Sequence, residues 1–224
     1  TLDTLLDIFS QAMGSPVEME FSVNRENGEW IFYVLQIKPL IKNEYNLDID
    51  TEEIDMDKAV LKANKGMGNG KLTNIRDIVY VDPDKFNYLK TEQMAEEVKH
   101  FNEQMASNDT PYILIGPGRW GTRDRLTGIP VLWSDISKAK VIVEQGLKDF
   151  PLDASLGSHF FHNVTSMNVG YFAIPYDSDN SFINYDIIRR QELVEETEFV
   201  KHIRFQEPVT IYMDGRKQTT VITE

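Results

Sequence analysis

Apolar side chains recur at helical spacing at the start of the chain. Within residues 1–13 they fall three or four positions apart, as on one face of a helix. These positions are Leu2, Leu5, Leu6 and Phe9. The pattern predicts a short amphipathic helix, which we expect to end at the Gly-Ser-Pro of residues 14–16.

The next residues change to strict alternation of apolar and polar side chains. Residues 17–23 place Val and other apolar side chains at odd positions and Glu or Ser at even ones, as a half-buried strand does. Asn27 and Gly28 favour a tight turn, and residues 30–38 form a second strand-like run. Together the two runs predict a β-hairpin.

Residues 43–70 become acidic and then glycine-rich, with little periodicity, so we expect a linker there. Farther along, a helical stripe of Met94, Val98, Phe101 and Met105 predicts a helix that Thr91 could cap. Short apolar runs predict strands at 77–81, 112–115, 140–143, 170–174, 209–213 and 218–222. The fold class is therefore mixed α/β (α+β), with a mixed sheet in residues 71–224.

Composition narrows the possible partners. The 36 acidic and 23 basic side chains give a formal net charge of −13, which argues against nucleic acid and anionic membranes as partners. The chain has no cysteine and no apolar run long enough to cross a bilayer, and no signal peptide is apparent at its start. We expect a cytoplasmic protein.

The even-numbered side of the predicted hairpin has candidate chemistry. A turn near Asn27 would place Glu18, Glu20, Gln36 and Lys38 on one face. Magnesium takes one or two protein carboxylates and completes its shell with water and phosphate oxygens, while a lysine offsets phosphate charge. The face therefore suits ATP-bound Mg²⁺. The alternative is an ordinary solvated sheet face.

The hairpin sequence VEMEFSVNRENGEWIFYVLQIKP resembles the closing strands of the ATP-grasp domain in the phosphoenolpyruvate synthase and pyruvate phosphate dikinase family. Glu20, Gln36, Lys38 and Pro39 match the positions of that pattern. The resemblance implies that Glu20 helps to hold the Mg²⁺ of ATP and that Gln36 lies beside the phosphates or the metal. Lys38 stands where the family usually has arginine, and a lysine lacks the planar fork that grips phosphate.

The same resemblance implies a domain order. Residues 1–42 would be the C-terminal end of an ATP-grasp nucleotide-binding domain, 43–70 a linker, and 71–224 a mixed α/β domain of unknown role. The residues that grip nucleotide in the family would precede Thr1, so we expect the segment alone to be inactive. Its parent would be an ATP-dependent, kinase-like phosphotransferase, with its other domains as partners.

The segment YILIGPGRWGTRDRLTGIP runs from an apolar strand into a loop with four glycines, which we call the Gly-Arg loop (residues 116–128). Arg119, Arg123 and Arg125 concentrate positive charge in an acidic chain, and Gly-rich backbone lets N–H groups approach an anion. The loop predicts a site for a small phosphorylated or carboxylated metabolite. The alternative is a tight structural loop whose arginines pair with Asp124, Asp135 or neighbouring acidic residues.

A second cluster lies in LGSHFFHNVTSMNVGYF, which contains His159 and His162. His159 could act as acid, base or phosphoryl acceptor, although a buried histidine bonded to backbone is an alternative. The chain from about Lys71 onward also resembles the tail that follows the ATP-grasp region in a subset of bacterial synthase-like proteins, where stretches like GPGRWG and GSHFFHN recur. We hypothesise that His159 and the Gly-Arg loop line one anion-binding cleft. Residues 71–224 would then be a non-catalytic binding or regulatory domain.

Overall fold

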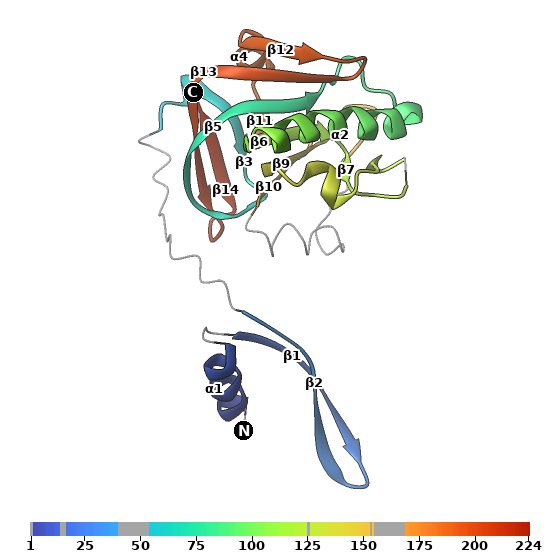
Figure 1. Ribbon diagram of the computed structural model, residues 1–224, viewed down its shortest axis with the longest axis vertical. Coiled ribbons are helices and arrows are strands. Elements are labelled where there is room, and N and C mark those ends of the chain that lie inside the picture. The colour runs from blue at the N-terminus through green and yellow to red at the C-terminus, as the bar shows by residue number, and fades with distance from the viewer. Residues whose placement is uncertain (1, 14–16, 40–53, 125, 153, 155–168) are drawn as a thin grey trace. The chain divides into compact units, whose positions relative to one another are not determined.

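The computed structural model describes residues 2–13, 17–39, 54–124, 126–152, 154 and 169–224. The chain divides into two compact units, Thr1–Glu44 and Tyr45–Glu224. The fold is mixed α+β and mostly sheet, as Figure 1 shows. No helix among the described residues is long and apolar enough to cross a membrane.

The first unit consists of one helix and one hairpin, as the sequence predicted. The elements are α1 (Leu2–Met13), β1 (Val17–Glu26) and β2 (Glu29–Pro39). Asn27 and Gly28 have φ angles of 52° and 88°, the left-handed backbone that a two-residue hairpin turn requires. The alternation of burial is less clean than predicted, because Phe21 and Val23 on the apolar side remain 41% and 45% exposed.

The second unit is built on a ten-stranded sheet, as far as the described residues show. Its path runs β11-β3-β14-β13-β5-β6-β9-β10-β4, and β12 pairs with β13. The strands are β3 (Ala59–Ala63), β4 (Gly66–Met67), β5 (Asn69–Val81), β6 (Tyr112–Pro117), β9 (Ala139–Gln145), β10 (Gly170–Ile174), β11 (Phe182–Ile183), β12 (Glu192–Glu196), β13 (Val200–Asp214) and β14 (Thr219–Thr223). Outside this sheet, β7 (Arg119–Trp120) pairs in parallel with β8 (Gly128–Ile129).

Strands β5, β6, β9 and β10 are parallel neighbours, and the remaining pairs of the sheet are antiparallel. Parallel strands are normally buried on both faces, which explains why their sequences are continuous apolar runs such as YILI and KVIV. Side chains of one parity, such as Val79 and Leu114, enter one core cluster. Those of the other parity, such as Ile78 and Ile113, enter a second cluster on the opposite face.

The helices cover these two faces. Helix α2 (Thr91–Ser107) connects β5 to β6 and lies along the sheet in Figure 1, with its predicted stripe of Met94, Val98, Phe101 and Met105 fully inside the first cluster. The short helix α4 (Tyr185–Arg189) contributes Ile187 and Ile188 to the second. Single 3-10 turns are η1 (Met56–Lys58), η2 (Tyr88–Lys90) and η3 (Trp133–Ile136).

Two details of the sequence prediction were wrong. Thr91 does not cap α2: the cap position is Lys90, without a side-chain hydrogen bond to the helix. The linker predicted for 43–70 is too long, because β3, β4 and the start of β5 lie in the sheet within it. Val60 and Leu61, at most 1% exposed, are part of the second core cluster.

Candidate functional site

The hairpin of the first unit brings the predicted polar residues together. In the register of β1 and β2, Glu18 lies opposite Lys38 and Glu20 opposite Gln36. Directly opposed residues of an antiparallel pair share a face, so these four positions are on one side of the hairpin. The side chains of Glu18, Glu20 and Gln36 are exposed, and Lys38 is placed by its backbone alone.

A bulge interrupts the ladder directly after this set. Glu20 pairs with Gln36, whereas Phe21 pairs with Val34, so Leu35 is the extra residue. Bulges increase local twist and end regular pairing. The polar face is therefore confined to the end of the hairpin away from its turn.

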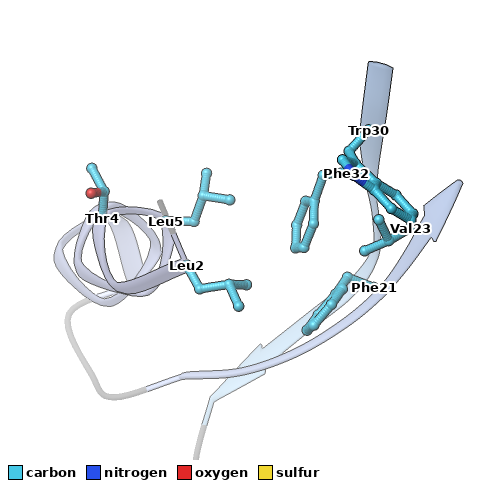
Figure 2. A pocket seen from close by; sticks show the side chains of 7 residues that line it. All are labelled: Leu2, Thr4, Leu5, Phe21, Val23, Trp30 and Phe32. Carbon is cyan, nitrogen blue, oxygen red and sulfur yellow. The ribbon is translucent and has the colours of Figure 1, made fainter. Parts of the chain in front are cut away.

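The opposite face of the hairpin is apolar. A groove of about 640 Å³ lies between α1 and the strands and is lined by Leu2, Thr4, Leu5, Phe21, Val23, Trp30 and Phe32. Figure 2 shows Leu2 and Leu5 of α1 facing the aromatic side chains of the hairpin. The rings of Phe21 and Phe32 stack with centroids 4.4 Å apart. The hairpin thus separates an apolar face from the face that carries the carboxylates.

The hairpin could bind a metal only together with other ligands. Among the residues that the structure describes, no group of three or more His, Cys, Asp or Glu side chains forms a metal site. Magnesium commonly retains water and takes substrate phosphate oxygens beside one or two carboxylates. The chemistry of Glu18 and Glu20 fits that partial shell.

In the second unit, the Gly-Arg loop starts at the carboxyl end of β6. Gly118 has a φ of 70°, and its N–H donates to the carbonyl oxygen of Gln145 at 2.8 Å. The Arg119 N–H donates to the carbonyl of Thr127, also at 2.8 Å. A Cβ at Gly128 would collide with the Arg119 backbone, so the parallel contact of β7 with β8 requires glycine there. The loop is a fixed structure around Arg119.

A buried carboxylate that the sequence analysis missed holds this loop to the sheet. Glu144 is 0% exposed, and its Oε1 accepts the Trp120 N–H at 3.0 Å. Its Oε2 accepts the Tyr171 hydroxyl, and the Trp120 indole N–H donates to the Val143 carbonyl at 3.0 Å. The sequence does contain a signal for this buried site, a single acidic residue directly after the apolar run KVIV. A carboxylate in a buried strand needs hydrogen-bond donors around it.

The predicted arginines differ in environment. Arg119 is half-buried and Arg123 is exposed, whereas Arg125 lies outside the described residues. The carboxylates suggested as their structural partners are engaged with backbone: Asp124 accepts the Leu126 N–H and Asp135 the Leu132 N–H.

A charged cluster adjoins the same edge of the sheet, at the end of β5. The Asp82 carboxylate contacts Lys201 Nζ at 2.9 Å and an Arg189 guanidinium nitrogen at 3.3 Å. Burial alone would raise the pKa of Asp82, but the hydrogen bond from Lys201, further supported by the Asp84 N–H and by Arg189, outweighs it and lowers that pKa. Nearby, the Tyr185 hydroxyl donates to the Gln145 side-chain oxygen. Burial raises the pKa of this Tyr185 hydroxyl. This edge therefore combines fixed cations and anions.

The histidine cluster lies outside the described residues. Ser158, His159 and His162 all belong to this cluster. The hypothesis that His159 shares a cleft with the Gly-Arg loop therefore stays a prediction.

Comparisons with known proteins do not assign a family. Over 109 residues the chain is 28% identical to Galectin-7 of Rattus norvegicus, a match that spans 47% of this chain and 79% of that protein. No family model matches the chain, and no solved structure matches it significantly.

Proposed function

We propose that this chain is the C-terminal part of a phosphoenolpyruvate synthase-like, ATP-dependent phosphotransferase. Its hairpin β1–β2 would be the end of an ATP-grasp domain and would contribute contacts to Mg²⁺ and ATP. The observation that carries the proposal is the register that opposes Glu20 to Gln36 and Glu18 to Lys38 on one polar face. The parent would work in the cytoplasm, in keeping with the absence of cysteine.

In this proposal each side chain has a separate role. Glu20, assisted by Glu18, ligates Mg²⁺, and Gln36 donates its amide N–H to a phosphate oxygen. Lys38 offsets the phosphate charge as a point charge. Phosphoryl transfer depends mainly on positioning and charge neutralisation, which such a face can supply beside a nucleotide held by other domains.

The test is the substitution Glu20→Gln in the full-length protein. Loss of one metal ligand removes charge stabilisation from the transition state, so we expect kcat/KM for ATP turnover to fall by about 100-fold or more. Glu29→Gln, at the turn end of β2, is the matched control and should turn over ATP normally. Unchanged turnover in Glu20→Gln would refute the proposal.

A second candidate function concerns the second unit by itself. The Gly-Arg loop, fixed by the hydrogen bonds of Gly118 and Trp120 at the carboxyl ends of the parallel strands, favours binding of a phosphorylated or carboxylated metabolite. The loop would sense that metabolite and regulate the phosphotransferase. Arg119, Arg123 and the predicted acid-base residue His159 would contact it.

Thermal-shift titrations with phosphoenolpyruvate, phosphate and citrate test this binding role, because a ligand of the folded state raises the melting temperature. Arg119→Gln should abolish the shift, whereas Arg76→Gln, an exposed change on β5, should retain it. A shift that persists in Arg119→Gln would place the ligand elsewhere.

A further inference from the structure

A small polar pocket lies beyond the carboxyl end of β10. It has a volume of about 300 Å³ and is lined by Asn64, Lys65, Pro175, Asp177, Ser178 and Ser181. The turn between β3 and β4 forms one wall, held to β10 by the Ala173 N–H, which donates to the Lys65 carbonyl at 2.9 Å. The segment that follows β10 forms the other wall.

Backbone amides fix the two hydroxyl groups of this pocket. The buried Ser181 Oγ accepts the Asn64 N–H at 3.0 Å, and the Ser178 Oγ accepts the Ser181 N–H at 3.1 Å. A serine hydroxyl has one proton to donate in addition to the bonds that it accepts. Because the amides occupy acceptor positions, the hydroxyl protons are available for an anionic group in the pocket.

The pocket also presents one charge of each sign. Lys65 and Asp177 are both exposed lining residues. Within the described part of the chain, neither side chain forms an ion pair, with the other or with any third residue. A ligand that satisfies both must carry an anion near Lys65 and a cation near Asp177.

We propose that this pocket binds a small zwitterion, of which an α-amino acid is the simplest kind. Its carboxylate would face Lys65 and the serine hydroxyls, and its ammonium would face Asp177. The volume is at the lower end of the range of small-molecule sites, which suits a ligand of this size. The site is separate in residues from the hairpin and the Gly-Arg loop, so it does not depend on the function proposed above.

The direct test follows the backbone amides of Asn64, Ser178 and Ser181 by NMR while the full chain is titrated with glycine, L-serine and L-leucine. At least one amino acid should shift these resonances with saturation. Acetate, inorganic phosphate and ethylammonium each carry one charge sign and should bind at least about tenfold more weakly, because half of the pairing is lost. No shift up to tens of millimolar of any amino acid, or equally tight binding of acetate or phosphate, would overturn the proposal.

Substitutions of Lys65 and Asp177 test which charge of the ligand each side chain binds. Lys65→Met and Asp177→Asn should each weaken amino-acid binding about ten- to a hundredfold, the range for a lost charged hydrogen bond. Lys62→Met and Asp179→Asn are matched controls outside the lining and should bind normally. If Lys65→Met does not fold, Asp177→Asn, on an exposed residue, decides by itself. Full affinity of Asp177→Asn for the amino acid would overturn the proposal that the pocket recognises a zwitterion.

Discussion

Glu144 shows how one residue can determine the position of a whole loop. Its carboxylate is 0% exposed and accepts one bond from the Trp120 backbone and one from the Tyr171 hydroxyl. A buried carboxylate is costly unless donors surround it, so this residue connects the Gly-Arg loop to two strands. Arg119 is the residue directly before Trp120, whose backbone Glu144 holds in place.

We predict that Glu144→Ala lowers the free energy of unfolding by roughly 2–5 kcal/mol, since two buried donors lose their acceptor. Urea denaturation, followed by the fluorescence of the tryptophans, measures the change. Glu192→Ala, at an exposed position of β12, is the control and should change stability by less than about 0.5 kcal/mol. An equally small effect at position 144 would show that the loop is held by other contacts.

At the scale of elements, α4 connects several parts of the second unit although it has only five residues. It buries Ile187 and Ile188, and its Tyr185 and Arg189 contact Gln145 and Asp82. Such a short helix has few internal hydrogen bonds, so its cap has a large share in its stability.

The cap is Asn184, whose side-chain oxygen accepts the Ile187 N–H at 3.2 Å. Asn184→Ala should reduce unfolding free energy by about 1 kcal/mol, because a buried N–H loses its partner. Asn184→Asp keeps an acceptor near the helix N-terminus and should retain wild-type stability in the same denaturation experiment. Equal losses in both variants would contradict the capping role.

Among elements, those with local signals were predicted well. The stripe of α2, the Asn27-Gly28 turn and the strand 170–174 are confirmed, because periodicity and turn chemistry depend on nearby residues. Strand β3 was missed, since its AVLKA is short and follows an acidic, aperiodic stretch. Its conformation depends on pairing with β14, about 160 residues away in the chain, which no local pattern reports.

At the scale of the whole molecule, the two units differ in how far they bury their apolar side chains. The second unit has two core clusters, one on each side of its sheet. Among the described side chains of the first unit, Val17 alone is buried, while Trp30 and Leu35 are 71% and 60% exposed. Because small units bury little surface on folding, we expect low stability of this unit by itself.

Buried charge networks give the second unit a predictable response to acid. Burial alone would raise the pKa of Asp77, but hydrogen bonds from His202 at 2.6 Å and Arg204 at 2.9 Å outweigh it and lower that pKa. The pKa of Asp82 is lowered in the same way. A carboxyl whose folded pKa is below its unfolded value adds stability above the unfolded pKa and loses it as pH falls through the folded pKa.

We therefore expect the free energy of unfolding to fall as pH decreases from about 4, near the ordinary Asp value. Urea denaturation between pH 7 and pH 2.5 measures this change. Asp77→Asn should be less stable at pH 7 and should lose less on acidification, whereas the exposed Asp186→Asn should follow the wild type. A variant at position 77 with the wild-type pH dependence would exclude this network as a source.

Local patterns in the sequence predict most of the longer elements and the turn at Asn27-Gly28. That turn and a regular ladder would pair Glu20 with Leu35, so it is the bulge at Leu35 that brings Gln36 and Lys38 to the face of Glu18 and Glu20. The sequence also located the Gly-Arg loop. The strand order and the hydrogen bond of Glu144 to the loop can be seen only in the tertiary structure. The same is true of the pocket that Lys65 and Asp177 line together. The physical reason is that these contacts join residues far apart in sequence, so they follow from packing of the whole sheet.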